Sequence, residues 1–181
     1  MKHEKRDDFV LAVVDVQEKF APAIDDFGGT VSSIVKLITG MQTLSVPILI
    51  TEQYPAGLGP TVPEISEALG GFNPLKKTSF SCCEAVSFSR SLQKLDRKNI
   101  VLCGIEAHIC IYNTCRDLIA DDYTVHIVAD AISSRRPYDK KIALRRMESD
   151  GAKLCTVEML LYELFHKAGT EEFKKLLKIV K

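Results

Sequence analysis

The 181-residue chain has the length of one domain with a core of its own. Its 24 Lys and Arg residues balance its 24 Asp and Glu residues, so no net field attracts nucleic acid or an anionic membrane, and we expect neither as a partner. The charged start, Met1 to Asp8, lacks the apolar stretch of a signal peptide, and no apolar run reaches the length of a membrane span. These features predict a cytoplasmic protein whose six cysteines are reduced.

Short β-branched runs alternate with longer amphipathic segments along the chain. Largely apolar runs predict strands over residues 9–14, 47–51, 99–103, 124–129 and 152–155, and residues 73–78 could supply a further short strand, the third in chain order. Apolar residues at helical spacing predict helices over residues 30–45, after Pro63, and over 83–95, 108–120, 138–150, 157–167 and 170–181. Thr30 is the expected cap of the first helix, and Gly104 is expected to break the fourth strand.

This order predicts a three-layer α/β/α fold: a six-stranded, mostly parallel, Rossmann-like sheet in one domain over residues 1–181. An order such as 3-2-1-4-5-6 leaves a crevice between the first and fourth strands, where ligands of such sheets bind beyond the strand C-termini. Asp15 ends the first strand and Cys110 begins the helix after the fourth, so this strand order would bring the two together.

Cys110 is the candidate nucleophile of this crevice. At the start of a helix, free N–H groups and the helix dipole favour a thiolate, and Asp15 follows five apolar residues that would desolvate it into a stronger base. Lys77 could supply a cation for both groups, with Lys76 as a rival for the same role. The alternatives are a capping role for Asp15 and a surface position for either lysine.

The chain resembles the isochorismatase-like cysteine hydrolase family in three segments: Phe9 to Phe20, Lys77 to Ser81 and Gly104 to Thr114. A fourth segment, Thr51 to Thr61, resembles the branch of this family called isochorismatase domain-containing proteins. The resemblance implies an Asp-Lys-Cys triad carried by Asp15, Lys77 and Cys110, with Lys77 preferred because it precedes the x-x-Phe-Ser pattern. It also implies a cis peptide at Ile105–Glu106, a homo-oligomer, and an oxyanion hole made by the backbone N–H groups of Glu106 and Cys110.

The resemblance implies a hydrolase that forms a thioester with a small amide or related carbonyl substrate. Family nicotinamidases carry Asp-x-His after the second strand, whereas this chain has Thr51 to Tyr54 without a histidine, and Glu52 alone is a weak ligand set, so we expect no metal. Gly57-Leu58-Gly59 is too short for a dinucleotide loop, and we expect no cofactor. The substrate-binding candidates, each of which could instead be packing or a backbone contact, are Gln17, Phe20, Tyr54, Phe80 and Tyr112.

Two other classes of function compete with the enzyme: a non-catalytic scaffold of the same fold, and a redox-sensing thiol protein. His108 lies two residues before Cys110, which points it to another side of the turn. Asp130, at the end of the fifth strand, is expected to cap backbone. The last two helices carry more apolar side chains than one sheet face is expected to bury, which favours self-association.

Overall fold

The computed structural model describes residues 5–180. Met1 to Glu4, within the charged start, and Lys181, in the last predicted helix, lie outside the described residues. The strands are β1 (Phe9–Val14), β2 (Ile48–Gln53), β3 (Leu75–Lys77), β4 (Asn99–Ile105), β5 (Thr124–Ser133) and β6 (Lys153–Cys155). The α-helices are α1 (Phe27–Thr43), α2 (Pro55–Leu58), α3 (Pro63–Leu69), α4 (Val86–Leu95), α5 (Tyr112–Ala120), α6 (Pro137–Ser149), α7 (Val157–Phe165) and α8 (Glu171–Val180). Short turns of 3-10 helix cover Arg6–Asp8 and Glu18–Phe20, and a π-helical turn, η3, covers Ala107–Ile111.

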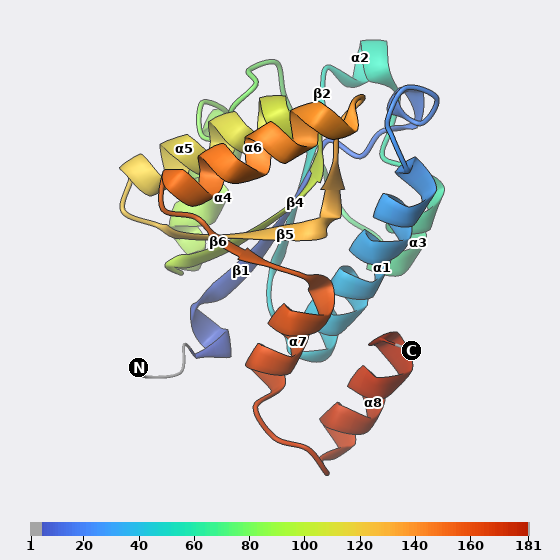
Figure 1. Cartoon of the computed structure of the whole chain (residues 1–181), viewed down its shortest axis with the longest axis vertical. Coiled ribbons are helices and arrows are strands. Elements are labelled where there is room, and N and C mark those ends of the chain that lie inside the picture. The colour runs from blue at the N-terminus through green and yellow to red at the C-terminus, as the bar shows by residue number, and fades with distance from the viewer. Residues whose placement is uncertain (1–4, 181) are drawn as a thin grey trace.

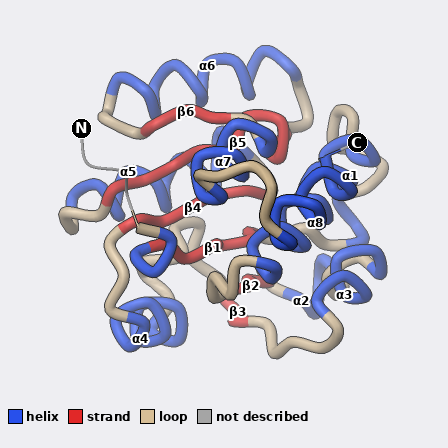
Figure 2. The backbone as a smooth tube through the Cα atoms, turned by 90° about the horizontal axis from the view of Figure 1, so that it is seen from below, coloured by secondary structure: helices blue, strands red, loops and turns tan. Residues whose placement is uncertain are grey.

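The strands form one parallel sheet in the order β3-β2-β1-β4-β5-β6, which confirms the predicted order. Helices α1, α3, α7 and α8 cover one face, and α4, α5 and α6 cover the other (Figure 1). Figure 2 looks onto the face of the sheet, where the strands lie side by side from β6 to β3. The three-layer α/β/α prediction is therefore confirmed.

The central strand β1 is buried at every position, as a parallel sheet covered on both faces requires. Its side chains alternate between two hydrophobic clusters: Leu11 and Val13 pack under α1 and α7, whereas Ala12 and Val14 pack under α4 and α5. The two cores fix β1 from both sides. The residue that follows it, Asp15, is thereby held at a defined place on the sheet edge.

Several predicted boundaries are wrong: β2 and β5 run on to Gln53 and Ser133 instead of ending at residues 51 and 129. Two further errors, at the start of α1 and at Gly104, have identifiable reasons. Helix α1 begins at Phe27, and its cap is Asp26, whose side chain accepts a hydrogen bond from Gly29 N at 3.3 Å; Thr30 is a buried residue inside the helix. Gly104 does not break β4, because it stays in register with Val14 of β1. This position needs glycine because its φ is +117° and because a Cβ added there would lie 2.1 Å from the Val14 carbonyl oxygen.

The final helices bury most of the apolar surface that the sequence attributed to self-association, so the expectation of a large exposed apolar face there is wrong. Leu160, Leu161, Leu164 and Leu176 are buried in the cluster shared with α1. Helix α1 accommodates α7 through Gly40, where a Cβ would lie 2.4 Å from Leu161. No helix within residues 5–180 is both long and apolar enough to cross a membrane.

Candidate active site

Three of the predicted site residues lie at the C-terminal edge of the sheet, where the strand order reverses between β1 and β4. Asp15 follows β1, Lys77 is the last residue of β3, and Cys110 lies in η3, directly after β4. Parallel strands end at the same edge, so residues 62 and 33 positions apart in sequence come into contact there.

Asp15 is fully buried and has a φ of +55°, a left-handed conformation that Asp tolerates better than most residues. Its backbone N–H donates to Thr51 O at 3.2 Å, which ties the turn to β2. Thr51 Oγ1 donates to Asp15 Oδ1 at 2.7 Å, and Lys77 Nζ donates to Asp15 Oδ2 at 2.6 Å. Both carboxylate oxygens therefore have a donor, as a buried charge requires.

The Lys77 side chain is fully buried, and its ammonium lies among five acceptors. Nζ donates to Asp15 Oδ2 at 2.6 Å and to Gln53 Oε1 at 2.7 Å, and lies 3.7 Å from Cys110 Sγ. The carbonyls of residues 79 and 80 lie at 3.2 and 3.4 Å. Burial is the largest single influence on the pKa of Lys77 and lowers it, but the charge and hydrogen bond of Asp15 together with the neighbouring thiols raise that pKa by more in sum, so the group stays an ammonium. The rival Lys76 is exposed on the same strand.

Cys110 is 6% exposed and lies in a turn where the N–H groups of Ile109 and Ile111 both donate to Glu106 O, at 3.1 and 3.2 Å. Such π-helical turns occur frequently at functional sites. Burial first, and then the charge of Asp15, raise the pKa of the Cys110 thiol, although Lys77 acts in the opposite direction. The resting thiol is therefore neutral, contrary to the direction expected from its place at a helix start.

The peptide bond between Ile105 and Glu106 is cis, at the position that the family resemblance implies. The Glu106 side chain is nearly buried and turns toward the β5–α6 connection. There its Oε2 accepts from Arg135 N at 3.1 Å and from Arg135 Nε at 3.0 Å. This pair fixes the segment between β4 and the cysteine.

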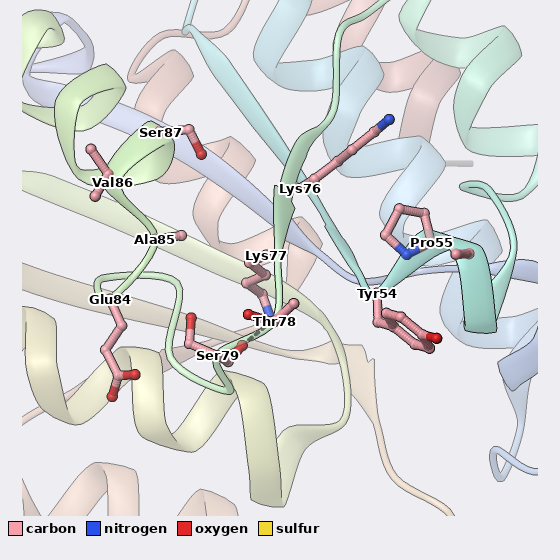
Figure 3. Close-up of a pocket in the computed structure, with 11 residues that line it drawn as sticks. Tyr54, Pro55, Lys76, Lys77, Thr78, Ser79, Glu84, Ala85, Val86 and Ser87 are labelled. Atoms are coloured by element: carbon pink, nitrogen blue, oxygen red, sulfur yellow. Dashed lines mark hydrogen bonds between the residues drawn. The ribbon is translucent and has the colours of Figure 1, made fainter.

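Two predicted substrate-binding residues lie beside Lys77. Tyr54 and Phe80 are 57% and 61% exposed, and the Phe80 carbonyl oxygen lies 3.4 Å from Lys77 Nζ. Tyr54 also lines an open hollow of about 520 Å³ together with Lys77, Ser79 and Val86 (Figure 3). Neither Asp15 nor Cys110 lies in its wall, so the hollow adjoins the three-residue cluster and does not enclose the sulfur.

The structure places the other three candidates away from Lys77 or commits their polar groups elsewhere. Phe20 packs, half-buried, against the α1 side of the core, and the buried Tyr112 ring lies 4.4 Å from the Arg146 guanidinium carbon. Gln17 is fully buried, and its amide contacts the backbone: Nε2 donates to Gln53 O at 3.0 Å, and Oε1 accepts from Gln53 N at 2.8 Å.

The remaining polar residues considered from the sequence have structural partners. His108 Nδ1 lies 3.0 Å from Ser134 Oγ, so its ring faces the β5–α6 connection. Asp130 lies inside β5 rather than at its end, and its Oδ1 accepts from the backbone N of Val157, the first residue of α7, at 2.9 Å. Glu52 Oε1 accepts from Thr61 N and Oγ1 at 2.8 and 2.9 Å. Within residues 5–180, no three His, Cys, Asp or Glu side chains are placed to share a metal ion.

Sequence reasoning missed two residues that contact the cluster, Thr51 and Gln53, and a third, Cys82, that contacts Thr51. Thr51 and Gln53 hold Asp15 and Lys77, as described above, and Cys82 Sγ lies 3.9 Å from Thr51 Oγ1. Burial raises the pKa of the Cys82 thiol to about 11. The period-two spacing of Thr51 and Gln53 could have revealed them, because alternate strand residues share a face and parallel pairing places Gln53 opposite Lys77.

Comparisons with known proteins agree with this fold. The sequence model of the isochorismatase domain matches residues 9–159. Isochorismatase domain-containing protein 2A of Mus musculus is 43% identical over 176 residues, covering 95% of this chain and 82% of the mouse protein. The zebrafish (Danio rerio) protein 2 is 43% identical and covers 94% of this chain and 86% of its own length.

Solved structures show the same architecture. The MAR1 ribonuclease structure from Caenorhabditis elegans has a TM-score of 0.92 and 37% identity, covering 99% of this chain and 92% of its own. The YcaC structure from Escherichia coli, described as an octameric hydrolase of unknown specificity, has a TM-score of 0.91 over 99% and 91% of the two chains; at 18% identity it shows the fold alone. The chain therefore belongs to the isochorismatase-like hydrolase family.

Proposed function

We propose that the protein is a cysteine hydrolase that cleaves a small amide or a related carbonyl compound. The observation that carries the proposal is the contact of one buried ammonium with two groups: Lys77 Nζ lies 2.6 Å from Asp15 Oδ2 and 3.7 Å from Cys110 Sγ. A base, a cation and a nucleophile in mutual contact are the parts that covalent acyl transfer requires.

In the proposed reaction, Asp15 takes the Cys110 proton as the sulfur forms a bond to the substrate carbonyl carbon. The carbonyl oxygen becomes an oxyanion, to which the N–H groups of Glu106 and Cys110 donate; one such donor lowers a barrier by roughly 3 kcal/mol. Asp15 then gives the proton to the leaving amine as the carbon–nitrogen bond breaks. Water, deprotonated by Asp15, attacks the resulting thioester, and the carboxylic product leaves as Cys110 regains its proton.

Lys77 has an electrostatic role in this scheme. Burial alone would make the thiolate costly, and the positive charge 3.7 Å from the sulfur offsets the negative charge that forms there. A scaffold has no need for a buried lysine between a carboxylate and a thiol, because such a pair costs desolvation energy. This arrangement favours the enzyme over the scaffold alternative.

The test is a search by mass spectrometry for a covalent adduct after incubation with a panel of small amides and activated esters. We expect an acyl adduct on Cys110, turnover of at least one compound, and the loss of both in Cys110→Ala with the fold intact. Cys83, the one half-buried cysteine, is the internal control. Adducts on Cys83 and not on Cys110 would show that labelling depends only on solvent exposure of the thiol, and would contradict the proposal. Full turnover by Cys110→Ala would also contradict it.

A second candidate activity comes from the nematode relative, which is called a ribonuclease. RNA therefore belongs in the substrate panel. The balanced charge of this chain, 24 basic against 24 acidic residues, gives it no general affinity for a polyanion. If the protein cleaves RNA and Cys110→Ala does not, RNA is a substrate of this same site. Reversible oxidation of the cysteines without any acyl adduct would favour the redox-sensor alternative.

We also propose that the chain forms a homo-oligomer, as YcaC does. Tyr54 and Val86 line the hollow of Figure 3, and Phe80 follows the lining residue Ser79 in sequence. All three are more than half exposed, an unusual concentration of large apolar side chains on a surface. Light scattering after size-exclusion chromatography gives the mass; a 20.1 kDa particle at micromolar concentration would contradict this proposal.

A further inference from the structure

The ammonium of Lys77 has a neutral partner that is nearly as close as its charged one. Gln53 Oε1 accepts from Nζ at 2.7 Å, against 2.6 Å for Asp15 Oδ2. An ammonium has three N–H donors. These two short bonds occupy two of them, which leaves one for the more distant group of acceptors: the carbonyls of Ser79 and Phe80 and the sulfur of Cys110.

The orientation of the Gln53 amide is fixed by its other end. Its Nε2 donates to the Thr78 carbonyl oxygen at 2.8 Å, and a carbonyl can only accept. The amide oxygen must therefore face Lys77. A flipped amide would set two N–H donors against the ammonium and the amide oxygen against a carbonyl, so the hydrogen-bond network permits one orientation.

The backbone of Gln53 is itself clamped by Gln17. The Gln17 amide accepts from Gln53 N at 2.8 Å and donates to Gln53 O at 3.0 Å, as a neighbouring strand would. The same Nε2 donates to Gly59 O at 2.7 Å, which joins the 54–60 loop to this clamp. Because Gln17 is fully buried just after Asp15, the clamp ties β2 to the turn that carries the carboxylate.

We infer that Gln53 is a positioning residue for Lys77, with Gln17 as its anchor; the inference rests on the proposed function only for its effect on turnover. Gln53 fixes one N–H direction of the ammonium, so that another remains directed toward the sulfur. A neutral amide does this without adding negative charge. A carboxylate at position 53 would compete with Asp15 for the cation and oppose the charge that forms on Cys110.

Two substitutions separate these contributions. Gln53→Met keeps the length of the side chain and removes the acceptor, whereas Gln53→Glu keeps the shape and adds a charge. Gln42→Met is the matched control, because Gln42 is an exposed glutamine on α1 whose amide makes a 3.5 Å contact with Leu69 O. Circular dichroism and thermal melting establish that each variant is folded.

The readout is the rate at which iodoacetamide alkylates Cys110, followed by mass spectrometry from pH 7 to 10 and requiring no substrate. We expect Gln53→Met to react about tenfold more slowly at pH 8, the size of effect typical of one hydrogen bond to a charged group. Gln53→Glu should be slower still, with its whole pH profile displaced upward, and Gln42→Met should match the wild type. A residue that only supports the fold would lower the melting temperature without this ordered displacement.

Rates in both Gln53 variants equal to or faster than the wild-type rate would overturn the inference, and so would failure of both to fold, because a positioning residue predicts folded proteins with an altered thiol. The outcome is separable from the proposed function. If no substrate is turned over but alkylation slows in the expected order, the amidohydrolase proposal fails and the inference stands. If Cys110→Ala abolishes turnover while both Gln53 variants keep kcat and the wild-type alkylation rate, the inference fails alone.

Discussion

Replacing Lys77 by Met tests how strongly the buried ion pair between Lys77 and Asp15 stabilises the fold. Lys77 Nζ and Asp15 Oδ2 are 2.6 Å apart, and both side chains are fully buried. At an effective dielectric constant of about 20, unit charges at that distance attract by about 6 kcal/mol, and most of this offsets the cost of taking both ions out of water. Lys77→Met leaves the carboxylate with Thr51 as its partner and no cation.

Breaking one side of a buried pair typically costs about 3–5 kcal/mol. We expect a loss of about that size in the free energy of unfolding, measured by urea denaturation at pH 7 with the denaturant slope unchanged. Lys76→Met, on the neighbouring exposed residue, should change stability by less than about 0.5 kcal/mol. Asp15→Asn combined with Lys77→Met removes both charges and should recover much of the loss, because Asn tolerates the φ of +55° at position 15.

A loss below about 1 kcal/mol in Lys77→Met would refute the reasoning, because no buried, unpaired carboxylate could then have been created. Equal losses in the single and double variants would also refute it, since they would show that the cost comes from packing and not from charge. The thermodynamic cycle built from the three variants gives the coupling energy of the pair directly.

Two further predictions concern stability. Gly104→Ala would place a Cβ 2.1 Å from Val14 O at a φ of +117°, so we expect at least about 3 kcal/mol of destabilisation or no soluble protein; a wild-type melting temperature would contradict the register of β1 and β4. Burial raises the pKa of Cys82 to about 11 and of Cys115 to about 12, from 9.0, so the unfolded chain loses these protons first. The contribution of the two protonated thiols to the free energy of unfolding is complete below pH 9 and is lost as the pH rises toward 12. For Cys82 the loss is roughly 3 kcal/mol. Urea unfolding in the presence of a reductant, at pH 8 and at pH 10.5, measures this decrease in the free energy of unfolding. The decrease should be smaller in Cys82→Ala. A free energy of unfolding that stays constant up to pH 11 would contradict the burial of these thiols.

The sequence predicted the central strands well because β1 and β4 are buried on both faces and are nearly continuous apolar runs. The error at Gly104 has the opposite cause: the pairing that keeps this glycine in β4 is a contact with β1, about ninety residues away, which no local pattern records. Asp26 was missed as a helix cap because Thr30, a good capping residue, stands at the first apolar turn of the same pattern. Local rules describe what a residue tolerates, and tertiary contacts decide among the tolerated options.

The residues of the site also differ in whether local sequence patterns could predict them. The strand-end position of Asp15 and the helix-start position of Cys110 follow from the apolar pattern and the strand order. The choice of Lys77 over Lys76 rested on family resemblance, because both lie in one short strand whose inward face the sequence did not define. Gln53 was missed because the second strand was expected to end at Thr51, two residues early, which left Gln53 in a loop with no assigned direction. A strand extended by one period-two step would have placed it opposite Lys77.

The neutral resting state of Cys110 restricts how the proposed hydrolysis can proceed. Enzymes that hold a preformed thiolate depend on a cation that outweighs burial, whereas here burial and the Asp15 charge together outweigh Lys77 and raise the pKa of the thiol. The proton must then leave the sulfur as the new bond to carbon forms, and the acceptor must already be in contact with the thiol. Asp15 meets this condition because its carboxylate shares a hydrogen bond with the Cys110 side chain, and because Thr51 and Lys77 hold its two oxygens in place. The ammonium consequently acts on the charge that develops during attack rather than on the resting sulfur, which is where electrostatic stabilisation lowers a barrier and does not merely tighten the ground state.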